Sequence, residues 1–250
     1  MSDFLLYFLL FLAGIGSGFL NVMAGGGSTL TLPLLILLGH SSALANGTNR
    51  VAIVIQNIAA VASFRSLDVH EFRRSLAYTF WALPGALIGA IAGVTISNDA
   101  FQTILGVVMI ATIFSLFIPS PRSEESNSGA SGARHWSIYP AMLLIGFYGG
   151  FIQVSVGFLF MVALYHIERM NLVYVNMHKV TIVLMYMVPA LVIYAVTGNV
   201  DWVLGIVLGI GSAIGGWWAA HASVKKGEKL IRAVLVIAIL VMALKLFDLY

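Results

Sequence analysis

The stretch NVMAGGGSTLT, residues 21–31, interrupts an apolar run that extends from residue 4 to residue 38. The three consecutive glycines at 25–27 weaken a helix, because each costs about 1 kcal/mol relative to alanine. The run is also too long for a single membrane crossing, which needs about 20 apolar residues. We therefore expect one full helix, a break at the glycines, and a short second helix that begins at Ser28.

The composition outside this stretch is that of a chain that faces lipid. Of its 250 residues, 60% are hydrophobic and 9% are charged, whereas a soluble domain carries about 25% charged residues. The cationic residues fall in short clusters without interleaved aromatic residues, which excludes a nucleic-acid interface. The sequence contains no cysteine, so disulfides, thiolate nucleophiles and cysteine metal sites are excluded as well.

Further apolar segments long enough for membrane helices follow along the chain. They are residues 44–64, 75–96, 101–118, 172–197, 202–221 and 230–249. A second long run, 138–166, is punctuated at Gly157 and predicts another helix followed by a short one. The N-terminal segment lacks a positive n-region, so we interpret it as the first membrane helix rather than a signal peptide. The sequence therefore predicts an all-α, polytopic membrane protein.

A polar linker divides this chain into two related halves. We expect a first membrane repeat at 1–118, a Ser-, Gly- and Pro-rich linker at 119–137, and a second repeat at 138–250. At an offset of 132, six positions correspond: Leu12/Leu144, Gly14/Gly146, Gly18/Gly150, Phe19/Phe151, Asn21/Gln153 and Gly25/Gly157. At an offset of 130 the corresponding positions are Asn46/Asn176 and Asn49/Lys179. Small loop deletions explain the falling offset.

The placement of charge predicts opposite orientations for the two repeats. The loop after segment 44–64 is basic, with Arg65, Arg73 and Arg74, but its counterpart at 197–201 holds only Asp201. The next loop, 97–100, is acidic, but its counterpart holds Lys225, Lys226, Lys229 and Arg232. Because cytoplasmic loops carry the Lys/Arg excess, we expect two inverted-topology repeats of four to five helical elements, as in many secondary transporters. The linker is then cytoplasmic and both termini lie outside.

The glycine-rich break is the main candidate for a binding site. Backbone that opens inside a bilayer must be buried in protein or line a wet cavity. The N-terminus of the following helix exposes free N–H groups and the positive end of a dipole, which attract anions. The alternative interpretation is a glycine hinge that only lets helices pack closely.

A second motif, ANGTNR at residues 45–50, places Arg50 inside an apolar segment, and Lys179 lies near the equivalent position of the second half. A cation inside a span marks a transport pathway by default, although both side chains could instead reach the interface.

His178 could exchange a proton or act only as a hydrogen-bonding core group. Gln56 and Asn57 either line the pathway or bond across helices.

Several runs together resemble the sulfite exporter TauE/SafE family, also called the toluene-sulfonate uptake permeases. They are 14–33 (GIGSGFLNVMAGGGSTLTLP), 45–51 (ANGTNRV), 84–89 (PGALIG) and 198–202 (GNVDW), in an order that covers nearly the whole chain. The resemblance implies a multi-pass transporter of sulfur-containing anions, such as sulfite, sulfonates or sulfoacetate, in a bacterial inner membrane. The second half departs from the family pattern, because Gly-Thr at 47–48 corresponds to Met177-His178.

The resulting hypothesis is a secondary transporter of a small anion that works by alternating access, with a proton or another ion as the candidate coupled partner. The candidate substrate-binding residues are Asn21, Gly25, Gly26, Gly27, Ser28, Thr29, Asn46, Gly47, Thr48, Asn49, Arg50, Gln153, Ser155, Gly157, Asn176, His178 and Lys179. No metalloprotease motif, nucleophile elbow or Walker motif is present, so we expect no catalysis, no cofactor and no metal. An anion channel of the same fold and a non-transporting membrane assembly protein are the alternatives.

Overall fold

The computed structural model describes residues 3–115 and 136–246, and every regular element within these ranges is an α-helix. The helices are α1 (Asp3–Ala24), α2 (Ser28–Leu37), α3 (Ser42–Ser66), α4 (Phe72–Thr95), α5 (Asn98–Ser115), α6 (Ile138–Phe151), α7 (Val156–His166), α8 (Leu172–Val196) and α9 (Trp202–Leu246). The predicted all-helical fold is confirmed. The predicted linker at 119–137 lies almost entirely outside the described residues.

Four helices of the described ranges are long and apolar enough to cross a membrane. These segments are Phe4–Ala24, Phe72–Thr95, Leu172–Val196 and Trp202–Ile231. Their outer faces expose large apolar side chains, among them Phe80, Val196 and Trp218. Such surfaces are stable against lipid tails and would be unusual on a soluble monomer. The structure therefore supports a membrane protein.

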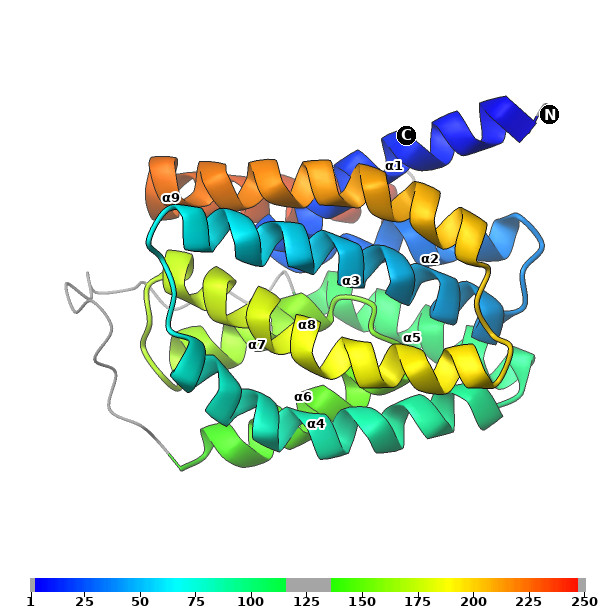
Figure 1. The fold of residues 1–250 in the computed structure, drawn as a ribbon, viewed down its shortest axis with the longest axis horizontal. Coiled ribbons are helices and arrows are strands. Elements are labelled where there is room, and N and C mark those ends of the chain that lie inside the picture. The colour runs from blue at the N-terminus through cyan, green and yellow to red at the C-terminus, as the bar shows by residue number, and fades with distance from the viewer. Residues whose placement is uncertain (1–2, 116–135, 247–250) are drawn as a thin grey trace.

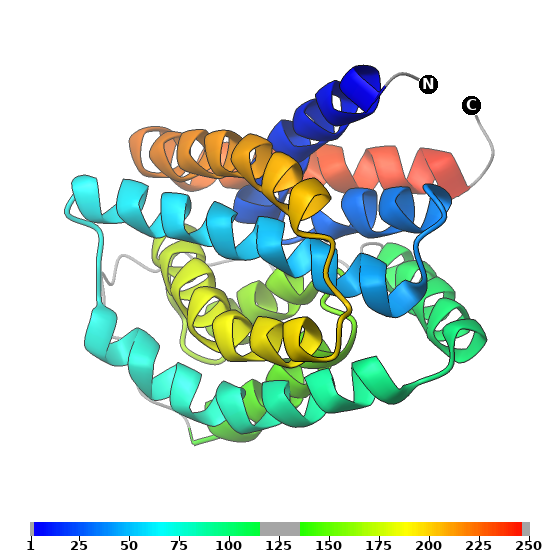
Figure 2. The same ribbon diagram turned by 45° about the vertical axis from the view of Figure 1, so that its right-hand side comes forward.

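The long helices pack side by side along the longest axis of the molecule (Figure 1). α1 packs along α9, and α6 packs along α4. α3 contacts both α8 and α9, which places it near the centre of the bundle. Figure 2 shows the same arrangement from the side, with α3 between the layer of α9 and the layer of α4 and α8.

Glycines allow the closest of these contacts. A Cβ atom on Gly18 of α1 would collide with the backbone of Ser212 in α9, and one on Gly89 of α4 would collide with Phe147 in α6. Small residues let helices approach closely in a membrane, where packing rather than hydrophobic burial drives association.

Basic side chains gather at one end of the bundle. The α3–α4 loop, the α7–α8 loop and the kink of α9 at Gly227 lie at one end, and the loops that precede α3, α5 and α9 lie at the other (Figure 1). The first end carries Arg65, Arg73, Arg74, Arg169, Lys225, Lys226 and Lys229. The loops at the opposite end contain no Lys or Arg between residues 38 and 41, 96 and 97, or 197 and 201. The loop with Arg65, Arg73 and Arg74 and the segment with Lys225, Lys226 and Lys229, both basic in the sequence, therefore lie at the same end of the bundle.

Both predicted breaks are present, but the second lies elsewhere than expected. The first separates α1 from α2 at residues 25–27, as predicted. The second separates α6 from α7 at residues 152–155, so the prediction of a break at Gly157 is wrong. Gly157 belongs to the first turn of α7, where its missing side chain admits the backbone of Gly25: a Cβ on Gly157 would lie 2.6 Å from the Gly25 Cα.

Replacing Gly157 with alanine should therefore loosen the junction of the two breaks. The added methyl group would press against backbone that cannot rotate away, and overpacking of this kind costs about 1–3 kcal/mol. We expect the Gly157→Ala variant to unfold several degrees below the wild type in detergent. Gly16→Ala is the matched control, because no atom lies within 4 Å of a Cβ built on Gly16. Equal midpoints for the two variants would contradict the contact.

Candidate functional site

The two breaks bring strained backbone to the middle of the bundle. Gly25 ends α1 with a φ of +76°, a conformation that glycine adopts at little cost. At the second break, Gln153 and Ser155 adopt φ values of +71° and +57°. Left-handed backbone costs a non-glycine residue on the order of 1–3 kcal/mol and is concentrated at functional sites. Both residues are also buried, so this strain is held by the surrounding helices.

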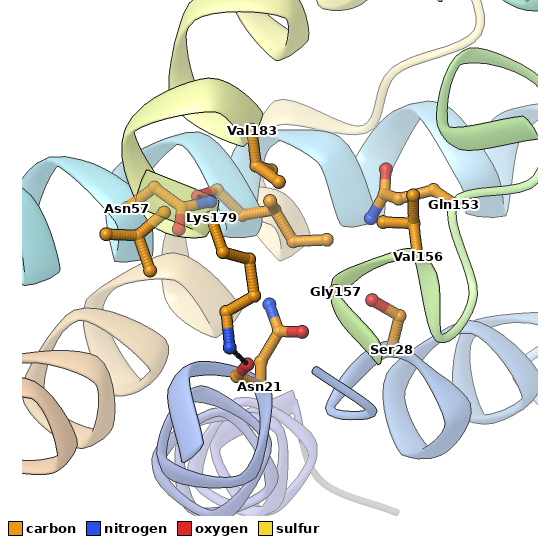
Figure 3. A pocket seen from close by; sticks show the side chains of 10 residues that line it. Asn21, Ser28, Asn57, Gln153, Val156, Gly157, Lys179 and Val183 are labelled. Carbon is orange, nitrogen blue, oxygen red and sulfur yellow. Dashed lines mark hydrogen bonds between the residues drawn. The ribbon is translucent and has the colours of Figure 1, made fainter. Parts of the chain in front are cut away.

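A small cavity lies where the two breaks meet. It is lined by Asn21, Ser28, Ile53, Asn57, Gln153, Val156, Gly157, Lys179, Val180 and Val183. Figure 3 shows Lys179 on one side, Gln153 on the other, and Asn21 and Ser28 approaching from the first break. The cavity volume is about 10 Å³, which is roughly room for one water molecule.

Lys179 caps the helix that ends at the first break. Its ammonium group donates to the carbonyl oxygens of Asn21 (3.1 Å) and Val22 (2.6 Å), and to Asn176 Oδ1 (2.8 Å). The last carbonyls of a helix have no partner within the helix and carry the negative end of its dipole. A lysine from α8 therefore stabilises the interrupted end of α1.

Arg50 does the same for the helix that ends at the second break. Its guanidinium group, on α3, donates to the carbonyl oxygens of Gly149 (3.3 Å), Gly150 and Phe151 (3.5 Å) at the end of α6. The group also lies over the ring of Tyr194, 4.4 Å from its centroid. Each of the two cations thus caps a broken helix that belongs to the other half of the chain.

These cations leave positive charge in the interior. Arg50 and Lys179 are both buried, and in the described part of the chain neither lies within ion-pair distance of a carboxylate. Isolated buried charges are costly unless they are hydrogen-bonded or paired. Hydrogen bonds are supplied by the helix ends, and an anion at the cavity would supply the missing counter-charge.

Several neutral donors near the breaks have no partner within the described residues. They are the amide nitrogens of Asn49, Gln56, Gln153 and Asn176 and the hydroxyl of Ser155. The amide oxygen of Gln153 is also without a partner. Each buried polar group left unpaired costs about 1–3 kcal/mol. The Gln153 side chain lines the cavity, where a bound oxyanion could accept the hydrogen bond from its amide.

The structure brings some of the predicted site residues together and places others elsewhere. Asn21, Ser28, Gln153, Gly157 and Lys179 line the cavity. Gly25, Gly26 and Gly27 form the first break beside it, where Thr29 Oγ1 donates to the Gly26 carbonyl (2.6 Å).

A second group of predicted residues ties helices together instead. The Asn46 amide donates to the Phe151 carbonyl (2.7 Å) and to the Tyr194 hydroxyl (2.8 Å). Thr48 Oγ1 accepts from the backbone N–H of Asp201 (2.9 Å), and Gly47 lies against the Asn199 carbonyl. These contacts hold α3 to the end of α6, to α8 and to the α8–α9 loop, and none of the three residues lines the cavity.

The two neighbouring polar residues on α3, Gln56 and Asn57, have different surroundings. The Gln56 side chain accepts from the Asn21 amide across helices (3.2 Å), and Asn57 lines the cavity. Sequence reasoning missed the aliphatic lining from Ile53, Val180 and Val183, because apolar residues in a membrane helix carry no signal of a cavity. It also missed Glu168, which is fully buried although it lies in a polar loop.

The capping role of Arg50 leads to a stability prediction. Arg50→Met removes the donors for the α6 carbonyls, and hydrogen bonds to charged groups contribute about 1.5–3 kcal/mol. For a chain of this size the thermal midpoint in detergent should fall by roughly 5–10 °C. Arg65→Met, at the exposed end of α3, should change the midpoint by no more than about 2 °C. Equal effects would show that Arg50 does not support the break.

Comparisons with known proteins identify the family of the chain. The family described as Sulfite exporter TauE/SafE matches residues 10–246. The probable membrane transporter protein YfcA of Escherichia coli K12 is 28% identical over 246 residues, covering 97% of this chain and 90% of the relative. The probable membrane transporter protein ORF9 of a Sinorhizobium species is 25% identical over 248 residues, covering 98% and 95%. No solved structure gives a significant match. The chain therefore belongs to the sulfite exporter TauE/SafE family and is a membrane transporter.

Proposed function

We propose that the protein is a secondary transporter that carries a small sulfur-containing oxyanion or organosulfonate through the cavity between the two breaks. The observation that carries this proposal is the cavity itself, where Lys179 and the amide of Gln153 face the same space. A sulfite or sulfonate group offers three oxygen acceptors, which suits a site built from donors. The chain's family points to the same class of anion.

An inverted repeat would explain how such a site opens to both sides. α3 and α8 each contain 25 residues, begin 130 residues apart, and run in opposite directions (Figure 1). The packing of α1 on α9 has its counterpart in the packing of α6 on α4. The caps correspond in the same way, because Arg50 on α3 caps α6 and Lys179 on α8 caps α1. These correspondences support alternating access by rocking of one repeat against the other.

The size of the cavity supports a step in which the protein closes around its cargo. Space for roughly one water molecule is too small for a sulfonate. Helices on at least one side must therefore separate before an anion enters or leaves. We assign the basic end of the bundle to the cytoplasm of a bacterial cell, following the distribution of Lys and Arg in its loops.

Anion binding should be visible as thermal stabilisation of the purified protein. We expect sulfite, sulfate, methanesulfonate or sulfoacetate to raise the unfolding midpoint, because a ligand at 100 times its Kd stabilises the folded state by about 2.7 kcal/mol. Acetate serves as the carboxylate comparison. If none of the sulfur anions raises the midpoint or enters proteoliposomes in a saturable manner, the proposed function is wrong.

The Gln153→Met variant separates binding from folding. The substitution removes a buried amide that lacks a partner, so the midpoint without anion should not fall, and it should rise if the amide is unpaired in the free protein. Stabilisation by the anion should be lost at the same time. Gln102→Met, on the exposed side of α5, should retain that stabilisation. A Gln153→Met protein that is stabilised by anions like the wild type would place the site elsewhere.

A further inference from the structure

A second polar cluster lies between α8, the start of α4 and the α7–α8 loop, at the basic end of the bundle. The members of this histidine–carboxylate cluster are Glu71, Arg74, Ser75, Tyr78, Glu168 and His178. His178 and Glu168 are fully buried, whereas the side chain of Glu71 is 24% exposed. The cluster therefore connects the outside of this end of the bundle with a residue adjacent to Lys179, which lines the cavity.

Both ring nitrogens of His178 face groups that suit either protonation state. Nδ1 lies 2.8 Å from Ser75 Oγ, and Nε2 lies 3.3 Å from Glu71 Oε2, at an angle outside hydrogen-bond geometry. A serine hydroxyl donates to a neutral imidazole and accepts from a protonated one. A carboxylate beside Nε2 stabilises the charge of the imidazolium. The ring can therefore gain or lose a proton without exchanging its partners.

The charged side chains around a neutral His178 ring carry one net negative charge. Glu71 immediately precedes α4 and Arg74 lies in its first turn; Arg74 is 3.7 Å from Glu71 and 2.8 Å from Glu168 of the α7–α8 loop. Tyr78 donates to the same Glu168 oxygen (2.6 Å) and meets the ring edge-on. Glu71 and Glu168 together carry one more negative charge than Arg74 offsets, so protonation of His178 removes the net negative charge of the cluster and makes the potential at the neighbouring cavity more positive.

Other charged groups on packed elements are engaged elsewhere. Glu228 of α9 accepts from the backbone N–H of Leu172 at the first turn of α8, and Arg50 of α3 caps α6. Neither group lies within ion-pair distance of His178, so the added charge acts on the cavity that the next residue, Lys179, lines.

In the first half, the position equivalent to His178 holds a residue that does not titrate. At the offset of 130 that relates α3 to α8, His178 corresponds to Thr48 and Glu71 corresponds to Asp201. The Thr48 hydroxyl accepts from the Asp201 backbone N–H (2.9 Å), so the same two positions meet through a neutral hydrogen bond. A histidine also approaches Asp201, with His40 Nε2 3.5 Å from Asp201 Oδ2, but it comes from the loop before α3 and not from the long helix that carries the interior cation.

From this geometry we propose that His178, together with Glu71, is a proton-binding site that couples proton movement to anion transport. Glu71 takes up a proton from the aqueous side and transfers it to Nε2 of His178, which leaves a Glu71 carboxylate and an imidazolium. The imidazolium attracts the anion to the cavity, and the bound anion favours the protonated ring by the same factor, because coupling between two sites is reciprocal. The inference rests on the proposed anion transport and adds its coupling ion and the residues that bind it.

Proteoliposomes test the coupling with radiolabelled methanesulfonate, whose charge does not change near neutral pH, and a pH-sensitive dye inside the vesicles. In the wild type, uptake should acidify the lumen, and the external concentration for half-maximal uptake should fall by up to about tenfold per pH unit on acidification. His178→Gln should abolish both effects, while a residual pH-independent exchange of labelled for unlabelled methanesulfonate persists. Glu71→Gln should slow the proton-coupled uptake. His166→Gln, an exposed histidine at the same end, should behave like the wild type.

Nuclear magnetic resonance of 15N-histidine-labelled protein in detergent tests proton binding without relying on transport. The His178 signal is identified by its absence from His178→Gln among the six histidines. It should change from imidazole to imidazolium when the sample is acidified. A His178 ring that stays neutral until the protein unfolds, or luminal acidification that persists in His178→Gln, would overturn the proton site. Absence of saturable methanesulfonate uptake by the wild type would instead contradict the transport of this anion, and the titration of His178 would still decide whether the ring binds a proton.

Discussion

Two helices end inside this protein, and their carbonyl groups must find donors there because a bilayer offers no water. Lys179 supplies donors to the end of α1, and Arg50 supplies them to the end of α6. Each cation comes from a helix of the other half of the chain, so neither half can complete its own break. The rest of the site depends on this capping of each broken helix by a cation of the other half, because it stabilises both breaks at the same place in the bundle.

The exchange also sets the electrostatics of the cavity. The negative ends of α1 and α6 are offset by the cations, and the starts of α2 and α7 add the positive ends of two more dipoles. Within the described residues no carboxylate lines this space. A cavity with this electrostatic potential favours an anionic ligand. Buried donors such as the Gln153 amide add specificity for an anion that has hydrogen-bond acceptors. If the two halves of the chain separated, both caps would be weakened at once. Opening of the cavity would therefore also disrupt the anion site.

The sequence predicted the helices and the first break well, because apolar length and three adjacent glycines have direct physical consequences. It predicted the second break at Gly157, although the chain leaves helical geometry at Gln153 and Ser155. Nothing in the sequence signals that strain, since neither residue is a glycine or proline. The sequence placed Arg50 and Lys179 within apolar segments but left open whether their side chains reach the interface, and the structure buries both. Their partners could not be predicted, because the carbonyls that they cap lie 99 and 157 residues away in the chain.

The central claim is that the cavity between the two breaks is the place where the anion binds. The chain contains no cysteine, so a single Ser28→Cys variant reports on this cavity without a background signal. Labelling with a membrane-impermeant thiol reagent should occur from both sides of the proteoliposome membrane. Methanesulfonate should slow this labelling at concentrations that saturate its uptake. Labelling at an unchanged rate at those concentrations, or no labelling from either side, would contradict the account.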